Sequence, residues 1–310
     1  MIINVGNRTD IPAFYSDWFY NRIDEGYVCS RNPFNPTKVI KYRLDPEVVD
    51  CLAFCTKNPK PMLDRLSKID KFRQFWFVTI TSYGKDIEPN VPDKKEIIDS
   101  FKKLSDYVGP DSVSVRYDPI LIYGKYDIAW HIKCFDKLCE SLEGYTHDIV
   151  ISFLDLYEKV KKNAPELRPP SKEEEDILAK EFGIIGKKYG MTIRGCLEDA
   201  RLSKYGLDMR GCMTKEVIEK AINAKLKVPT IQSKREGCSC LLGNEIGEYN
   251  TCMHLCKYCY ANYSKEVVIE NFKKHNKNSP LLIGNIEPDD EVVESKQKSW
   301  IVDNNQISLF

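Results

Sequence analysis

Three closely spaced cysteines in the last quarter of the chain are the residues best suited to chemistry. They lie in the segment Cys252-Met-His-Leu-Cys256-Lys-Tyr-Cys259, a C-x3-C-x2-C pattern. Three thiolates at this spacing can hold three irons of a [4Fe–4S] cluster and leave the fourth iron open to a substrate or cofactor. The motif therefore predicts a reactive cluster with Tyr258 beside its last ligand. His254, inside the motif, is either a hydrogen-bond donor to the cluster or a solvated loop residue.

Four more cysteines beyond residue 190 are candidate ligands: Cys196, Cys212, Cys238 and Cys240. They can form a closed four-thiolate site for either an auxiliary [4Fe–4S] cluster or a structural zinc. Cys238 and Cys240, only two positions apart, can also be shared with the first centre. Zinc throughout is the alternative, but zinc sites usually show paired C-x2-C or C-x4-C spacings. The pattern therefore favours at least one iron–sulfur cluster.

Composition favours a cytoplasmic protein. The chain has 310 residues with 46 basic and 46 acidic side chains, so no global charge attracts it to nucleic acid or membrane. The first residues lack the pattern of a signal peptide, and no apolar run approaches the length of a membrane span. Twelve cysteines in such a protein are unlike a disulfide framework. Five of them are expected to be core residues: Cys29, Cys51, Cys55, Cys134 and Cys139.

The first half of the chain alternates between short apolar runs and amphipathic segments. Strands are predicted at residues 2–5, 28–30, 51–55, 76–81, 112–116 and 149–153. Helices are predicted at residues 94–107 and 128–142. This alternation predicts an α/β fold with a parallel sheet, most simply a (β/α) barrel or partial barrel.

Polar clusters follow most of these strands. In a barrel they would share the rim at the carboxyl ends of the strands, where barrel enzymes place their sites. Asn-Pro and Asp-Pro can also be plain turn signals, but turns do not explain the charged residues in the clusters. We therefore expect a functional rim that positions cofactor and substrate and consists of Arg8, Asp10, Arg31, Lys57, Arg116 and Asp118.

Three parts are expected along the chain: a barrel over residues 1–195, a cysteine-rich cluster-binding segment over residues 196–263, and a peripheral polar tail over residues 264–310. Within the first part, Ser171 and Glu174 form a capping box that predicts a helix running to about Tyr189. Residues 191–194 are predicted to form the last strand.

The chain resembles the DUF1848 family of uncharacterised bacterial proteins. The resemblance is carried by short segments spread over nearly all of these elements: Arg8-Thr-Asp-Ile-Pro-Ala-Phe14, Arg31-Asn-Pro-Phe-Asn-Pro36, Thr56-Lys-Asn-Pro59, Asp86-Ile-Glu-Pro-Asn90, Arg116-Tyr-Asp-Pro119, Ile246-Gly-Glu-Tyr-Asn-Thr-Cys252 and Tyr258-Cys-Tyr-Ala-Asn262. Membership implies little about function.

The segment Cys259-Tyr-Ala-Asn262 also resembles radical S-adenosylmethionine (SAM) enzymes of the spore photoproduct lyase type, over about ten residues. That resemblance implies that SAM binds the open iron, that an electron donor reduces the cluster, and that the resulting radical abstracts hydrogen from a substrate. In those enzymes the motif follows the first barrel strand, whereas here it follows the last predicted strand. Their Gly-Gly-Glu element is not evident in this sequence.

The last five residues, Gln306-Ile-Ser-Leu-Phe310, resemble the peptide with which bacterial polymerases and repair proteins bind the sliding clamp. In such a peptide, Leu309 and Phe310 would enter an apolar pocket while Gln306 bonds at a second one. The alternative is an apolar pair that docks on the protein's own surface.

Three functions are compatible with these features. The first is an iron–sulfur, SAM-dependent radical enzyme that acts on nucleic acid in a DNA-repair role and is recruited by the clamp. The second is a radical SAM enzyme that modifies a peptide, an RNA or a small molecule. The third is a non-enzymatic protein that binds nucleic acid or another partner and is stabilised by metal.

Overall fold

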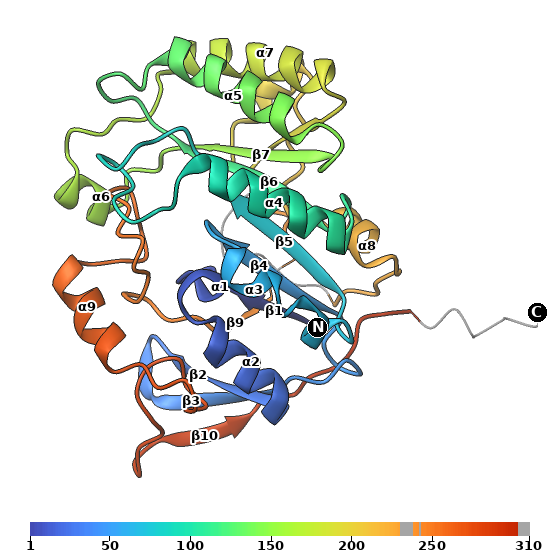
Figure 1. Ribbon diagram of the computed structural model, residues 1–310, viewed down its shortest axis with the longest axis vertical. Coiled ribbons are helices and arrows are strands. Elements are labelled where there is room, and N and C mark those ends of the chain that lie inside the picture. The colour runs from blue at the N-terminus through green and yellow to red at the C-terminus, as the bar shows by residue number, and fades with distance from the viewer. Residues whose placement is uncertain (230–237, 242, 303–310) are drawn as a thin grey trace, which may run out of the picture.

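The computed structural model describes residues 1–229, 238–241 and 243–302, and its largest element is a seven-stranded parallel sheet (Figure 1). The strand order is β8-β7-β6-β5-β4-β1-β9, and each neighbouring pair is parallel. The strands in that order are β8 (Thr192–Gly195), β7 (Asp148–Phe153), β6 (Val113–Ile120), β5 (Gln74–Thr79), β4 (Cys51–Thr56), β1 (Ile2–Val5) and β9 (Asn244–Glu245).

The predicted α/β class and parallel sheet are confirmed, but a closed barrel is not observed. In the part of the chain that the structure describes, β8 and β9 are the two edges and no ladder joins them. One reason is that the face of the sheet that a closed barrel would enclose is covered by other segments. These are α8 (Lys215–Ile222) and the cysteine-rich residues next to it in sequence.

Helices cover the other face of the sheet. The main ones are α2 (Ser16–Glu25), α4 (Lys94–Val108), α5 (Ile128–Leu142) and α7 (Lys172–Lys188). Alternate strand residues, such as Leu52 and Phe54 of β4, pack with these helices in the main core. The residues between them, such as Cys51 and Ala53, pack toward α8 in a second core. Two-sided burial explains why the strands are almost continuously apolar.

Shorter helices connect these elements. They are α1 (Ile11–Phe14), α3 (Lys60–Leu63), η1 (Leu66–Ile69), α6 (Glu158–Asn163), η2 (Ala200–Tyr205) and α9 (Lys265–Lys273). None of the helices in the described ranges combines the length and the apolar composition that a membrane crossing requires.

The strand predicted at residues 28–30 exists but belongs to a different sheet. It lies in β2 (Tyr27–Asn32), which pairs antiparallel with β3 (Asn35–Arg43), and β3 pairs in parallel with β10 (Glu291–Glu294). This small sheet forms a separate layer at the bottom of Figure 1. The prediction that β2 contributes to the rim of the large sheet is therefore wrong, because the turn after Asn32 folds it onto β3.

The predicted capping box at the start of α7 is confirmed. The Ser171 hydroxyl accepts from the Glu174 backbone N–H at 3.3 Å, and the Glu174 carboxylate accepts from the Ser171 backbone N–H at 2.7 Å. The helix then ends with Tyr189 as its C-cap, where the sequence predicted its end.

Replacing the cap tests how much this helix terminus contributes to stability. Ser171→Ala removes one acceptor from the first turn and is expected to lower the free energy of unfolding by about 1 kcal/mol. Ser171→Asp keeps an acceptor at the same place and is the matched control. Urea unfolding followed by circular dichroism measures both, and equal midpoints for Ser171→Ala and wild type would contradict the prediction.

Candidate metal centre

The polar positions of the sheet gather at the carboxyl ends of its strands, on the face opposite the large helices. Strand pleating places Asn4, Cys55, Thr79, Arg116 and Ser152 on this face, each from a different strand. All five line one cavity of about 680 Å³. Apolar residues nearer the amino ends of the strands pack against α8 and form the floor below them.

All seven candidate cysteines line this same cavity. They are Cys196, Cys212, Cys238, Cys240, Cys252, Cys256 and Cys259. They come from two stretches on either side of β9: the segment between β8 and β9, and the loop that follows β9. The structure thus places the predicted group of four cysteines and the predicted group of three around the same cavity.

The C-x3-C-x2-C loop follows the edge strand β9, which pairs in parallel with β1. The loop extends over the ends of the neighbouring strands. Within the motif, Leu255 has φ 55°, a left-handed conformation that a leucine side chain rarely adopts. Surrounding contacts must hold such a residue in place, and two buried carboxylates provide them.

The first anchor is the carboxylate of Asp10. Its Oδ2 atom lies 2.8 Å from Nε2 of His254 and accepts the Lys57 backbone N–H at 2.6 Å. Its Oδ1 atom accepts the Thr56 hydroxyl at 2.7 Å and the Ala13 backbone N–H at 3.0 Å. Each oxygen thus has two partners, so Asp10 positions the cysteine loop, and the residue also lines the cavity as predicted.

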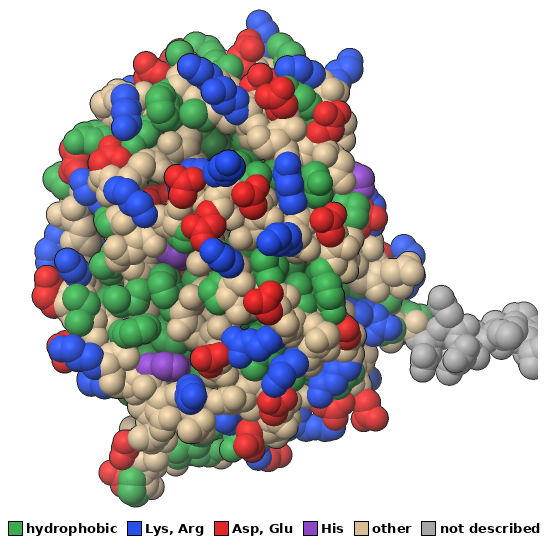
Figure 2. Space-filling view, viewed as in Figure 1, with side chains coloured by type: hydrophobic (Ala, Val, Ile, Leu, Met, Phe, Trp, Pro, Cys, Tyr) green, Lys and Arg blue, Asp and Glu red, His purple; other side chains and the backbone are tan. Residues whose placement is uncertain are grey.

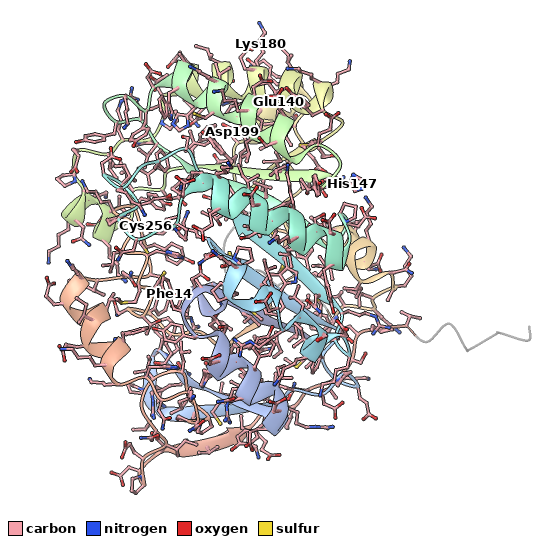
Figure 3. All side chains as sticks on the ribbon, in the orientation of Figure 1. Phe14, Glu140, His147, Lys180, Asp199 and Cys256 are labelled. Atoms are coloured by element: carbon pink, nitrogen blue, oxygen red, sulfur yellow. The ribbon has the colours of Figure 1, made fainter. Side chains whose placement is uncertain are left out.

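His254 is buried, which rules out the solvated loop residue considered from the sequence. It is only 2% exposed, and Phe14 packs edge-on against its ring with the centroids 4.6 Å apart. Figure 3 labels Phe14, which packs on His254, and Cys256, which is two positions further along the motif. His254 therefore fixes the cysteine loop to Asp10, in the segment that follows β1.

The second anchor is the carboxylate of Glu88, which is 1% exposed. It accepts from Lys57 Nζ at 2.8 Å, from the Thr81 hydroxyl at 2.8 Å, from Lys94 Nζ and from the Tyr258 hydroxyl. Burial opposes ionisation of Glu88, but the two lysines outweigh burial and lower its pKa to about 2. Tyr258 thus secures the cysteine loop through its hydroxyl while its ring lines the cavity.

Arg116 and Asp118 lie beside the four-cysteine group. The Arg116 guanidinium donates to Asp118 at 2.7 and 3.0 Å and approaches the Cys196 and Cys212 sulfurs at 3.5 and 3.9 Å. The Cys212 sulfur lies 3.5 Å from that of Cys196 and 3.4 Å from that of Cys240. The Met213 backbone N–H adds a contact of 3.2 Å to the Cys240 sulfur.

Across the described residues, no three His, Cys, Asp or Glu side chains are arranged, as they stand, to hold a single metal ion. The short sulfur contacts found in this part of the chain involve Cys196, Cys212 and Cys240 and do not join the motif cysteines. Burial raises the pKa of Cys256 to about 12 and raises the pKa of Cys259, although Lys57 lies near both and Lys159 near Cys259.

The remaining predicted residues divide into three groups. Arg8 and Lys57 line the cavity as expected. Arg31 does not, because its strand belongs to the small sheet, where it pairs with Asp290 and the Asn285 carbonyl. The clamp-like residues Gln306, Leu309 and Phe310 lie outside the described residues.

Sequence reasoning missed Glu88 and Lys94. Glu88 lies in the segment Asp86-Ile-Glu-Pro-Asn90, which was among those that carry the family resemblance. Its position soon after a rim strand was an available signal. The contact of Glu88 with Lys57, which directly follows β4, was not predictable, because sequence spacing gives no measure of a contact across 31 positions.

The fold and this site define an α/β protein with a thiol-lined cavity at the carboxyl ends of a parallel sheet. The chain belongs to the family described as "Domain of unknown function (DUF1848)", whose family model matches residues 2–261. The matched span includes all seven candidate cysteines. Neither the curated proteins nor the solved structures gave a match.

The Glu88 network provides a test of the second anchor. Glu88→Gln leaves Lys57 and Lys94 largely buried without a counter-charge and is expected to lower the free energy of unfolding by about 3–5 kcal/mol. Glu96→Gln is the matched control, since its ion pair with Lys60 is exposed and worth at most about 1 kcal/mol.

The pH dependence follows from the lowered pKa of Glu88. Its contribution is complete above the unfolded pKa of 4.5 and is lost as pH falls from there toward 2. Urea unfolding at several pH values should therefore show the wild-type advantage over Glu88→Gln shrinking in that window. An advantage that is constant with pH, or no larger than that of the control, would contradict this assignment.

Proposed function

We propose that this protein is an iron–sulfur enzyme in which Cys252, Cys256 and Cys259 hold a [4Fe–4S] cluster and SAM is the co-substrate. The observation that carries the proposal is the position of the C-x3-C-x2-C loop. It leaves an edge strand of a parallel sheet and lines a cavity at the carboxyl ends of the strands. Parallel α/β enzymes place their reactive groups at that end.

The donor set fits a cluster with one open iron. Three thiols are offered, and the other groups nearest to them, His254 and Tyr258, are engaged by Asp10 and Glu88. Neither is therefore free to act as a fourth ligand. When bound, such a cluster supplies the electron that cleaves SAM and so initiates radical chemistry on a substrate.

The chain's own residues contribute charge and shape. Lys57 places a cation near Cys256, and Lys159 of α6 places one near Cys259, so both offset the charge of thiolate ligands. Phe77, Leu154 and Met213 give the cavity an apolar lining that limits water. Asn4, Asn7 and Ser152 offer polar contacts that can orient a bound molecule.

The order of strands in the sheet supports the resemblance to radical SAM enzymes. In those enzymes the motif follows the first strand, whereas in this chain it follows β9, the last strand of the sheet in sequence. In space, β9 is an edge strand beside β1, and the sheet continues from β1 through β4, β5, β6 and β7 to β8. A circular permutation would relate the two arrangements, so the late position of the motif is compatible with the proposed function.

We also propose that Cys196, Cys212, Cys238 and Cys240 hold a single zinc ion rather than a second cluster. Zinc–sulfur bonds of about 2.3 Å in a tetrahedron place sulfur atoms roughly 3.8 Å apart. The observed separations of 3.5 and 3.4 Å lie near that value. Cluster ligands bind different irons and lie farther apart.

Iron content and SAM cleavage test the main proposal. Protein prepared without oxygen is expected to be brown, to contain about four irons per chain, and to form 5′-deoxyadenosine from SAM on reduction. Cys256→Ser should lose the iron and the product, whereas Cys134→Ser, on α5, should keep both. Iron without SAM cleavage would contradict the radical chemistry, and no iron at all would contradict the centre.

Metal analysis of Cys212→Ser tests the second site. The wild-type protein is expected to contain about one zinc per chain in addition to iron. Cys212 contacts two of the other thiols, so its replacement should remove the zinc while the iron remains. A protein with about eight irons and no zinc would show that a second cluster occupies the site.

A further inference from the structure

The mouth of the cavity carries an unusual concentration of exposed aromatic rings. Tyr249, Tyr260 and Tyr263 are 38%, 46% and 61% exposed, and Tyr249 and Tyr260 line the cavity itself. The Tyr260 ring lies 5.7 Å from that of Tyr157, and its hydroxyl donates to the Asn7 carbonyl at 2.7 Å. The rings therefore present fixed faces to solvent at the entrance to the proposed reactive centre.

Two cations lie among these rings. Arg8 and Lys159 lie 5.2 and 5.5 Å from the centre of the Tyr249 ring, and Lys159 lies 4.2 Å from that of Tyr263. Neither cation forms an ion pair within 4.0 Å in the described ranges, and Arg8 interacts with the carboxylates of Glu245 and Glu248 only at longer range. Aromatic faces hold these side chains in place while leaving their charge available.

Other cations on the cavity wall are already neutralised. Lys57 pairs with Glu88, and Arg116 pairs with Asp118. Figure 2 shows the face over the large helices α4 and α5, where basic and acidic side chains are interspersed and form no patch of one sign. At the mouth, Arg8 and Lys159 provide a local positive charge.

We propose that this mouth binds single-stranded nucleic acid, with bases stacked on Tyr260 and Tyr263 and phosphates on Arg8 and Lys159. Exposed rings beside a positive groove are the two elements that proteins use for single strands. A free nucleoside, including that of SAM, would match the rings but would leave both cations without a phosphate. The inference deepens the proposed function, on which it rests, by naming the substrate class of the same cavity.

A single nucleic-acid strand bound at the mouth is consistent with chemistry inside the cavity. An enzyme that reacts with a base must take that base out of the stack, which is easiest in a single strand. The cavity of about 680 Å³ opens directly beneath the rings. A strand held across the mouth can therefore direct one base inward toward the motif cysteines while its neighbours stay stacked outside.

Fluorescence anisotropy with a labelled short oligothymidylate tests the proposal on the full-length, iron-loaded protein. Tyr263→Ala is expected to weaken binding roughly fivefold or more, whereas Tyr263→Phe should bind like the wild type. The backbone hydrogen bonds of residue 263 to Asn250 and Asn163 do not require its side chain, so the variant should fold. Tyr107→Ala removes a comparably exposed ring on α4 and is the control that should not change binding.

A salt titration tests the cation. Lys159→Gln should make the slope of log affinity against log salt concentration shallower by about 0.7, which is the value for one phosphate contact on a single strand. No oligonucleotide binding, or binding that neither Tyr263→Ala nor Lys159→Gln alters, would overturn the proposal. Free adenosine binding as tightly as the oligonucleotide would also overturn it, because phosphates would then contribute nothing.

Iron content is measured on the same samples. Intact iron with no strand binding would overturn this inference alone, whereas a protein without iron would overturn the proposed function. Wild-type iron content in each tyrosine variant is expected, and with it any loss of binding is assigned to the mouth rather than to the cluster loop.

Discussion

A single buried carboxylate, that of Asp10, holds together parts of the chain that are far apart in sequence. It caps α1, accepts from the residues that end β4, and contacts His254 from the cysteine motif, 244 positions away. A buried charge is stable only when hydrogen-bond donors surround it. Each of these segments must therefore be folded in place for the others to be stable. The loop that carries the cysteines is consequently a product of the complete fold.

Glu88 is a second buried carboxylate that anchors the cysteine motif, at the next strands of the sheet. Asp10 fixes the middle of the motif over β1 and β4, while Glu88 fixes Tyr258 over the end of β5 and its following loop. The C-x3-C-x2-C loop is therefore held at two points on either side of Cys256. Two anchors explain how Leu255 is kept in a left-handed conformation without a glycine, since neither end of the turn can relax independently.

The sequence predicted the elements better than their partners. The bounds of α5 and the start of α7 were correct because amphipathic spacing and a capping box are local signals. The strand over residues 28–30 was also present, but alternation does not reveal which sheet a strand joins, so Arg31 was wrongly placed at the rim. The strand β9 has only two residues, too few for any periodic pattern.

For the site, the cysteines were predictable and their surroundings were not. Cysteines at short spacing can be recognised as candidate ligands from the sequence alone, and the structure places all seven of these cysteines around one cavity. The roles of Asp10, Glu88 and His254 include contacts across 31, 47 and 244 positions, for which the chain offers no local cue. Asp10 lines the cavity, as its predicted place at the rim implied, but its four hydrogen bonds to distant and local donors could not be read from the sequence.

The distribution of positive charge around the cavity separates its parts by function. Arg116 serves the four-cysteine group, where it contacts two sulfurs, and Lys57 serves the motif, where it bridges Glu88 and the space near Cys256. Both are committed to carboxylates, so they balance charge within the protein itself. Arg8 and Lys159 are held by rings instead, at the entrance. Among the described residues, the cations therefore change from close ion pairs in the interior to ring contacts at the mouth, a gradient that would orient an anionic strand toward the thiol-lined cavity.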